Sequence, residues 1–458
     1  MRSGLSIAPE AFVSEMLRQG TPRVWLAPGR GSALRASHSW LGPLAEALGR
    51  EPDLDGHEAI FLAADPRSGA LFGAFLHRLT RGQAQGGLRH WRYESLAEVL
   101  RDGLRLSRGM GRKIALAGLW WGGGKGLIAR PPGAPAAGEA RRALFRAYGE
   151  FVSSLRGCYV TAEDAGTEPD DVAAVFERTR FVTCVPPAFG GSGNPSEATA
   201  EGVVCGMEAA LAALERGGLA GKCVALQGLG QVGAAMVERL LARGVARLVA
   251  SDVSPERARA VAARHPGGRL QVRVLEAGDT SLLAEACDVL APSAMGGVLG
   301  PETIPLLRAA VVCGAANNPL LDEHRDAETL RRRGIAYVPD YVVNRMGIVR
   351  CADEQSGTLP DDPAVQRHLD PAYDHGIPAV VRRVLALSRE RGIPTTEAAE
   401  ALADRLAAEP HPIFGERARA LVRALLASDW HAVRTQGGAA EETPGRAEPR
   451  TRRARARG

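Results

Sequence analysis

Two lysines and one aspartate have the residue types and surroundings of a proton-handling site. Lys125 follows three consecutive glycines in "LWWGGGKGLIAR" (119–130), Lys113 lies twelve residues upstream, and Asp164 ends the strand-like run "YVTAED". The stretch is not a phosphate-binding P-loop, because that loop needs a hydroxyl residue after its lysine and Gly126 stands there. Two ammonium groups and a carboxylate suit an α-amino acid. One ammonium can hold the substrate carboxylate, while the other lysine and the aspartate move protons.

A second glycine pattern, Gly228-x-Gly230-x-x-Gly233, has the spacing of a dinucleotide-binding fingerprint. It follows the strand-like "CVALQ" and opens a helical segment, so the first N–H groups of that helix can face a pyrophosphate. Asp252 ends the next strand-like run and can accept hydrogen bonds from a ribose diol, which favours NAD over NADP. Arg257 is near enough in sequence to moderate that preference. The pattern therefore predicts NAD as the cofactor and hydride transfer as the reaction type.

Strands and helices must bring these residues together, and the hydrophobic periodicity predicts where they lie. Apolar residues at helical spacing predict helices over 95–110, 140–155 and 198–216, and an apolar run predicts a strand over 59–65. From "CVALQ" onwards, short apolar strands alternate with helical segments, which is typical of a doubly wound parallel sheet. Between the two halves, the turn-rich "AFGGSGNPSEAT" (188–199) predicts a loop and a hinge. The fold class is therefore α/β, and 458 residues predict at least two domains.

Composition and charge narrow the classes of function. With 45% hydrophobic and 24% charged residues, no long apolar run and no secretory signal pattern, a cytoplasmic protein without a membrane span is expected. The seven cysteines include no CxxC pair, so they are interpreted as free thiols in a reducing compartment, and no metal site is expected. The net charge of +5 belongs to the end of the chain, where six arginines and one glutamate follow residue 445. No nucleic-acid-binding face is therefore predicted.

Together these residues resemble the Glu/Leu/Phe/Val dehydrogenase family, and most of all its leucine and phenylalanine dehydrogenase branch. The resemblance runs from about residue 56 to about residue 406, nearly the whole chain apart from both ends. Many motifs in one order make it specific. They are "GGLRHW" (86–91), "GMGRKIALAGLWWGGGKGLI" (109–128), "YVTAEDAGT" (159–167), "GGSGNPSEATAEGV" (190–203), "LQGLGQVG" (226–233), "APSAMGGVL" (291–299), "GAANNPL" (314–320), "VPDYVVNRMGIV" (338–349) and "GIPTTEAAEALA" (392–403).

The resemblance implies a reversible, NAD-dependent oxidative deamination of an apolar, leucine-like L-amino acid to the 2-oxo acid, ammonia and NADH. It implies an N-terminal α/β domain for substrate binding and oligomerisation, a Rossmann NAD-binding domain and a cleft between them, so self-association is expected. We place the boundaries as follows: a poorly defined N-terminal region at 1–55, the substrate-binding and oligomerisation domain at 56–195, the Rossmann domain at 196–350, C-terminal helices packing back on the first domain at 351–435, and a disordered Arg-rich tail at 436–458.

The resemblance also assigns roles to single residues. Lys125 and Asp164 fall on the catalytic lysine and aspartate, and Lys113 falls on the lysine that binds the α-carboxylate. The other matches are the backbone of Gly86 and Gly87 and the side chain of Asn344 at the substrate, and Thr199, Asn317 and Asn318 near the cofactor.

Several positions depart from the family's pattern and bear on the choice of amino acid. Gln85 precedes the glycine pair, where leucine enzymes usually carry an aliphatic residue and glutamate enzymes a lysine. Glutamine cannot pair with a γ-carboxylate, so glutamate is not the expected substrate. The other departures are Trp120, Trp121, Glu197, Arg345 and Met346, and the last two are expected near the cleft.

Three alternatives remain open at this point. The enzyme could act on phenylalanine, valine or an atypical polar amino acid. The departures at Arg345 and Met346 favour, to a small extent, a non-catalytic relative that binds NAD or an amino acid without turnover. An RNA-binding protein that uses the arginine tail is the weakest of the three.

Overall fold

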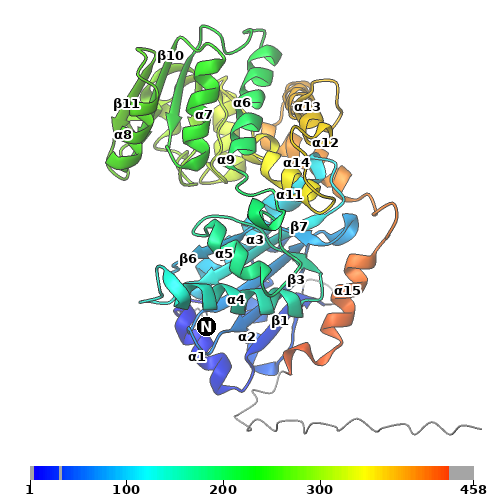
Figure 1. The fold of residues 1–458 in the computed structure, drawn as a ribbon. Helices are drawn as coiled ribbons and strands as arrows, with labels where there is room; N and C mark the ends of the chain where they lie inside the picture. Colours follow the sequence, from blue (N-terminus) through cyan, green and yellow to red (C-terminus); the bar gives the residue numbers. More distant parts are fainter. Residues whose placement is uncertain (1–4, 30–32, 433–458) are drawn as a thin grey trace, which may run out of the picture.

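The chain forms two α/β domains, the first low and the second high in Figure 1, with helices between them. The computed structural model describes residues 5–29 and 33–432. The predicted tail at 436–458 lies outside these residues. In the described part of the chain, no helix is long and apolar enough to cross a membrane, and no group of three or more His, Cys, Asp or Glu residues is placed to hold a metal ion.

The first domain is built on a mixed eight-stranded sheet in the order β2-β1-β3-β4-β7-β5-β8, with β6 also paired to β7. Its strands are β1 (Arg23–Pro28), β2 (Leu34–Ala36), β3 (His57–Ala64), β4 (Leu71–His77), β5 (Ala84–Gln85), β6 (Leu88–Trp91), β7 (Gly122–Ala129) and β8 (Tyr159–Val160). Its helices are α1 (Pro9–Arg18), α2 (Gly42–Leu48), α3 (Leu96–Leu116), α4 (Gly138–Ser154) and α5 (Pro169–Phe176). The described part of the poorly defined region 1–55 thus contributes two α-helices and two strands to this domain.

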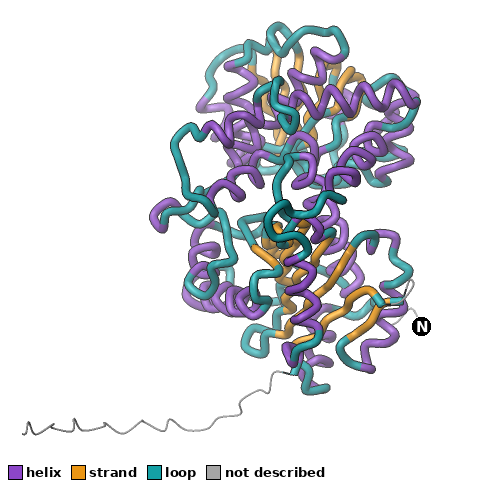
Figure 2. The backbone as a smooth tube through the Cα atoms, turned by 90° about the vertical axis from the view of Figure 1, so that its right-hand side faces the viewer, coloured by secondary structure: helices purple, strands orange, loops and turns teal. Residues whose placement is uncertain are grey.

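The second domain is a six-stranded, all-parallel sheet in the order β11-β10-β9-β12-β13-β14. Its strands are β9 (Cys223–Gln227), β10 (Arg247–Asp252), β11 (Leu270–Val274), β12 (Ala286–Pro292), β13 (Arg308–Val312) and β14 (Ala336–Tyr337). Its helices are α6 (Ser196–Ala213), α7 (Gln231–Ala242), α8 (Pro255–Arg264), α9 (Glu323–Arg332), α10 (Asp340–Val343) and α11 (Met346–Glu354). The tube in Figure 2 shows helices on both sides of this sheet, as expected for a doubly wound fold.

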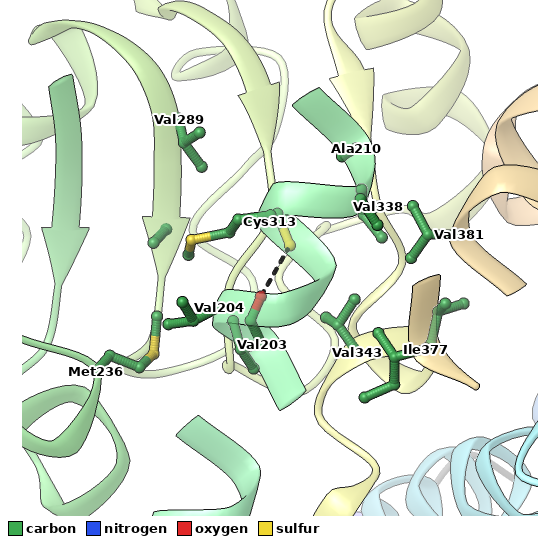
Figure 3. Packing of buried hydrophobic residues seen from close by; sticks show 14 of the residues in the cluster. Val203, Val204, Ala210, Met236, Val289, Cys313, Val338, Val343, Ile377 and Val381 are labelled. Atoms are coloured by element: carbon green, nitrogen blue, oxygen red, sulfur yellow. Dashed lines mark hydrogen bonds between the residues drawn. The ribbon is translucent and has the colours of Figure 1, made fainter. Parts of the chain in front are cut away.

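The C-terminal helices are shared between the two domains. They are α12 (Pro363–Gln366), α13 (Ile377–Arg391), α14 (Thr395–Ala407) and α15 (Arg417–Leu426). Among the described residues, α15 and the short turn after it join the core of the first domain, through Val422, Leu425 and Trp430, and α14 packs on α3 of that domain. By contrast, α13 packs on α6 in the core of the second domain, where Figure 3 shows Ile377 beside Val343 and Val381 beside Val338. The expectation that all of 351–435 packs back on the first domain was therefore wrong for α13, because its apolar face matches that of α6.

Two segments differ from their predicted form in ways that position the site. Helix α3 continues past residue 110 to Leu116, because Ile114, Ala115 and Leu116 extend its buried face, and this places Lys113 on its last turn. The glycine–lysine stretch is an inner strand of the first sheet, since β7 pairs with β4 along its whole length. The strand lies close under α3: a β-carbon on Gly123 would be 2.4 Å from the carbonyl oxygen of Ser107.

Candidate active site

A cleft of about 370 Å³ collects most of the predicted site residues from both domains. The first domain contributes its wall from the end of α3, from β7 and from the turn after β8. The second domain contributes residues from α6, from the turn after β13 and from the α10–α11 region. The predicted residues that line it are Gly87, Lys113, Lys125, Asp164, Thr199, Asn317, Asn318 and Asn344.

Lys125 and Asp164 form a buried ion pair at the centre of this cleft. The Nζ atom of Lys125 donates a hydrogen bond to Oδ2 of Asp164 over 2.6 Å, and Lys125 is 3% exposed. Burial lowers the pKa of Lys125, although the Asp164 carboxylate opposes that shift. Burial acts to raise the pKa of Asp164, but the Lys125 and Arg89 charges hold it well below its ordinary value. The pair therefore joins a carboxylate that stays ionised to a lysine that gives up its proton more easily than usual.

Lys113 faces the same cleft from the last turn of α3. Burial lowers its pKa to about 8, with a smaller effect in the same direction from the Lys125 charge and an opposing effect from Asp340. Asp340 lines the cleft as well, and burial raises its pKa to about 6 against the opposing charge of Lys113. Lys113 has no hydrogen-bond partner or ion pair among the described residues, so its ammonium is free for an anionic ligand.

Arg89 is a site residue that the sequence reasoning did not single out, although it lies within the quoted motif "GGLRHW". Its Nε atom is 3.4 Å from the same Oδ2 of Asp164 that binds Lys125. Its Nη1 atom donates to both carboxylate oxygens of Asp102, over 3.0 and 3.1 Å, and the Tyr93 hydroxyl donates to Asp102 over 2.7 Å. Arg89 thus lies between two carboxylates and is held in place from the side away from the cleft.

Gly86 and Gly87 bring the backbone next to the ion pair because no β-carbon fits there. A β-carbon on Gly86 would be 1.7 Å from the carbonyl oxygen of Gly124, and one on Gly87 would be 2.7 Å from the Asp164 β-carbon. The Gly86 carbonyl already accepts a hydrogen bond from the Tyr159 hydroxyl over 2.6 Å. Of the two glycines, Gly87 lines the cleft.

Asn344 is fixed in the cleft with one polar atom left over. Its Nδ2 atom donates to the Ala315 carbonyl and to Oδ1 of Asn317, both over 3.1 Å. The residue is 6% exposed, and its own Oδ1 atom is buried without a hydrogen-bond partner. A buried acceptor of this kind is costly unless something donates to it, so it points to a ligand with an N–H group.

Gln85 does not reach the cleft. Its side chain is fully buried and donates from Nε2 to the Thr183 hydroxyl over 2.9 Å. The side chain is directed to Thr183 inside the first domain, and the sequence could not show which way it would point. The structure therefore does not bring Gln85 together with the other residues assigned to the substrate.

Two of the unusual residues near Asn344 are packed away from the cleft. Arg345 is fully buried and donates to the carbonyl of His375, and Met346 packs against Gly202 of α6. Both were expected near the cleft, but the turn at Asn344 directs them into the core instead. The observation that favoured a non-catalytic relative is therefore lost.

The other departures also lie outside the cleft lining. The Trp120 ring covers the Arg81 guanidinium, whose central carbon is 3.9 Å from the ring centroid, and Glu197 pairs with Arg239 over 2.7 Å. Trp121 packs on an apolar cluster behind the cleft wall.

That apolar cluster is a further part of the site that the sequence did not reveal. It joins α3 to α11 across the two domains, and several of its side chains reach the surface of the cleft. Its residues come from distant segments with no common motif, so a sequence signal was absent. The members that line the cleft are Met110, Ala162, Cys184, Ile348 and Cys351.

A second cavity of about 1180 Å³ adjoins the cleft and shares Gln231 and Val232 with it. It contains the glycine fingerprint, in which Gly228 has a φ of 99° and a β-carbon on Gly233 would be 2.0 Å from the Gly228 carbonyl oxygen. A β-carbon on Gly230, by contrast, would have no other part of the protein within 4 Å, so the space beside this residue is open. This open cradle at the start of α7 fits a pyrophosphate.

Asp252 lies at the carboxyl end of β10, at the edge of this second cavity. Its carboxylate accepts hydrogen bonds from the Leu229 and Ser254 N–H groups over 2.7 and 2.8 Å. It also pairs with Arg257 over 2.8 Å. Although burial acts in the opposite direction, these hydrogen bonds hold the pKa of Asp252 below its ordinary value. The residue therefore offers an ionised acceptor whose charge is partly balanced by a half-exposed arginine.

Comparisons with known proteins agree with this geometry. The family model described as "Glu/Leu/Phe/Val dehydrogenase, dimerisation domain" matches residues 71–181, and the one described as "Glutamate/Leucine/Phenylalanine/Valine dehydrogenase" matches residues 190–255. The chain is 38% identical to a leucine dehydrogenase of Geobacillus stearothermophilus over 76% of this chain and 90% of that protein. It is 40% identical to a valine dehydrogenase of Streptomyces coelicolor over 79% of this chain and 94% of that protein.

A solved structure shows the same likeness. The crystal structure of L-tryptophan dehydrogenase from Nostoc punctiforme matches with a TM-score of 0.60 and 33% identity, over 77% of this chain and 96% of that one. Sequence likeness over nearly the whole length of these relatives, together with the lysine–aspartate cleft beside a dinucleotide fold, shows that the chain belongs to the Glu/Leu/Phe/Val dehydrogenase family of amino acid dehydrogenases.

Proposed function

We propose that this chain catalyses the reversible, NAD-dependent oxidative deamination of an aliphatic L-amino acid, with leucine or a close relative as substrate. The observation that carries the proposal is one cleft in which Lys113, Lys125, Asp164 and the unpartnered oxygen of Asn344 meet an apolar wall. That cleft opens towards a cavity built to hold a dinucleotide.

The polar residues can bind the two charged ends of an amino acid. The free ammonium of Lys113 is the partner for the α-carboxylate, since its pKa of about 8 leaves it mostly charged at neutral pH. The buried Oδ1 of Asn344 can accept a hydrogen bond from the α-ammonium, which would satisfy an acceptor that otherwise has none. The two contacts together orient the α-carbon between the domains.

The Lys125–Asp164 pair handles the protons of the reaction. When bound, the nicotinamide cofactor accepts the hydride from the α-carbon. Lys125 assists removal of the proton from the amine and then, as an ammonium, stabilises the oxygen that water adds to the resulting imine carbon. Asp164, held ionised by Lys125 and Arg89, exchanges protons with the amine and with that water. Lys125 is buried and Asp164 is partly exposed, so the carboxylate can exchange protons with water that enters the cleft.

The apolar wall supports an aliphatic side chain as the specificity group. Met110, Ile348 and the two cysteines offer hydrophobic contact, and Arg105 is a further cation in the cleft lining besides Lys113 and Lys125. Gln85 does not bear on the exclusion of glutamate, because that side chain lies outside the cleft. Phenylalanine and valine remain competing substrates, because a wall of flexible Met and small Cys side chains can fit different volumes.

The choice of NAD rests on Asp252. An ionised carboxylate at the end of β10 suits the two hydroxyls of a ribose and repels a 2′-phosphate. Arg257 weakens this repulsion because it already pairs with Asp252. We therefore expect a clear preference for NAD with measurable use of NADP, and replacing Asp252 by Asn should reduce that preference.

The test is NADH formation with a panel of L-amino acids, followed at 340 nm under steady-state conditions. Leucine, isoleucine and valine should give higher kcat/KM than glutamate or lysine, and Lys125→Ala should give no rate above background. If no amino acid yields NADH with the wild-type chain, the proposed function is wrong.

Two further expectations follow from the family and the cysteines. The family model that matches residues 71–181 is described as a dimerisation domain, so we expect a homo-oligomer. Light scattering coupled to size-exclusion chromatography measures its mass. All seven cysteines are free thiols, which favours a reducing compartment such as the cytoplasm.

A further inference from the structure

Two of the thiols that line the cleft touch each other. The Sγ atoms of Cys184 and Cys351 are 3.2 Å apart, although the residues are 167 positions apart in the chain. Both side chains are buried, at 2% and 3% exposure, and both line the cleft that holds Lys125 and Asp164. The remaining cysteines show no sulfur–sulfur contact within the described residues.

The two cysteines belong to different domains. Cys184 lies two residues beyond Val182, which bridges to Thr161 and so continues the edge of the first sheet. Cys351 lies on α11, whose Met346 and Val349 pack in the core of the second domain. A covalent bond between them would therefore join the two domains at the inner end of the cleft.

The backbone holds Cys184 in place for this contact. Glu354 follows Cys351 by three residues on α11, so both side chains lie on one face of the helix. Its carboxylate accepts hydrogen bonds from the N–H groups of Cys184, Val185 and Ser192, over 2.8, 3.2 and 3.1 Å. The loop that carries Cys184 is thus bound to the same helix face that carries Cys351.

Cys184 also has a backbone conformation that favours glycine. Its φ is 61°, in the left-handed region that residues with a β-carbon rarely adopt. A cysteine at such a position carries a conformational cost that glycine would avoid, and the cost is offset only if the side chain has a use. The side chain that this backbone presents contacts the Cys351 sulfur and packs in the apolar cluster of the cleft wall.

We propose that Cys184 and Cys351 are a redox modification site, at which a hydroperoxide converts the two thiols to a disulfide that joins the domains and stops turnover. The thiolate of one cysteine attacks the peroxide, the O–O bond breaks, and a sulfenic acid and an alcohol or water form. The second thiol then attacks the sulfenic sulfur, so that the S–S bond forms and water leaves. One peroxide is reduced and two thiols are oxidised, and an added dithiol reverses the change by exchange.

The geometry requires little movement for the bond to form. The sulfurs must approach from 3.2 Å to a bond length of about 2.0 Å. Burial and the neighbouring thiol raise the pKa of Cys184 well above its ordinary value, so its thiolate is scarce and the oxidation is slower than at an activated cysteine. The disulfide would stop turnover because it fixes the two domains to each other beside the cleft through which substrate enters and product leaves. This last step, unlike the bond itself, rests on the proposed function.

The experiment is oxidation of the full-length chain by hydrogen peroxide, with samples taken over time. Remaining thiols are alkylated, and peptide mapping by mass spectrometry measures the fraction of chains that carry a Cys184–Cys351 linkage, while NADH formation from leucine is measured in parallel. The linkage should form and most of the activity should disappear with the same time course, and dithiothreitol should restore both. The proposal is overturned if other thiols oxidise without this linkage, or if the linkage forms while the rate of NADH formation stays unchanged.

Three variants separate the pair from the other thiols. After peroxide treatment, Cys351→Ser and Cys184→Gly should each keep the rate of NADH formation that the same variant has without peroxide. Glycine is chosen at position 184 because it suits the left-handed backbone there. Cys205→Ser is the matched control, since its sulfur faces the Leu369 carbonyl rather than another thiol, and it should keep the wild-type response. Mass spectrometry reads the linkage without any turnover, so a chain that forms it but gives no NADH even when reduced would contradict the proposed function and not the disulfide.

Discussion

The two glycine-rich stretches of this protein use the same residue for opposite purposes. In β7, the glycines admit other parts of the protein: β-carbons on Gly123 and Gly126 would lie 2.4 and 2.2 Å from Ser107 and Tyr148. At the start of α7, a β-carbon on Gly233 would be similarly close to the Gly228 carbonyl oxygen. A β-carbon on Gly230 would meet no other part of the protein within 4 Å. A glycine therefore marks close packing in the first domain and, at Gly230, a space kept for a ligand.

This difference also separates the tasks of the two domains. Close packing of α3 on β7 brings Lys113 to the same cleft as Lys125. The glycines of β7 therefore affect the cleft indirectly, by allowing α3 to pack closely on the strand. The open space at Gly230 belongs to the proposed cofactor site, so a substitution there should act directly on cofactor binding. Substitutions at the two places should therefore have different signatures, and the following predictions use that contrast.

The largest effect is expected for Gly123→Ala. The added methyl group would meet backbone atoms of Ser107 and Gly111, which cannot rotate away, so α3 must move off β7. We expect the free energy of unfolding to fall by about 1–3 kcal/mol or more. The activity of the remaining folded protein should fall as well, because Lys113 moves with α3. Thermal unfolding and steady-state kinetics measure both; an unchanged melting temperature would contradict the packing interpretation.

Gly230→Ala should show the opposite signature. The methyl group meets no protein atom, so the melting temperature should stay within the error of the wild type. It occupies the space through which a pyrophosphate approaches, so the KM for NAD should rise about tenfold, equivalent to about 1.4 kcal/mol. The measurement is NAD saturation at fixed leucine. A loss of stability with normal NAD affinity would show that this turn, too, is only a packing feature.

The charge of Lys113 should make substrate binding depend on pH. Its pKa is lowered to about 8, so its ammonium is present below that pH and is lost above it. The affinity for a 2-oxo acid in the presence of NADH should therefore decrease as the pH rises through about 8, by several-fold over one to two pH units. Fluorescence titration of bound NADH measures it. Lys113→Arg, which keeps its charge, should flatten the profile; an equal pH dependence in that variant would place the titration elsewhere.

The smallest effect is expected for Trp120→Ala, next to the glycines of β7. The ring covers Arg81 at the surface and does not line the cleft, so its loss should cost about 0.5–1 kcal/mol of stability. The ratio of kcat/KM for leucine to that for phenylalanine should not change. A shift in that ratio would show that the tryptophan pair takes part in the choice of amino acid after all.

The positions of the proposed site that depend on local pattern could be predicted from the sequence. The fingerprint turn, Asp252 at the end of its strand and the lysine–aspartate set all follow from motifs whose spacing carries their geometry. Prediction from the sequence failed where the position of a side chain depends on which face of a helix or strand is buried. Gln85 and Arg345 stand at positions next to true cleft residues, yet their side chains point into the protein. Arg89 was in a quoted motif but had no stated role until Asp102 and Asp164 were seen on both sides of it.

By itself, the sequence determined the fold class, the family and the residue types that perform the chemistry, because these are written in contiguous motifs and in the hydrophobic period of each element. Only the tertiary structure decided that the glycine–lysine stretch is an inner strand, that an apolar wall forms from four distant segments, and that two thiols meet in it. The physical reason is that contacts between residues far apart in the chain depend on how helices and strands pack, and close packing selects partners that no local spacing records.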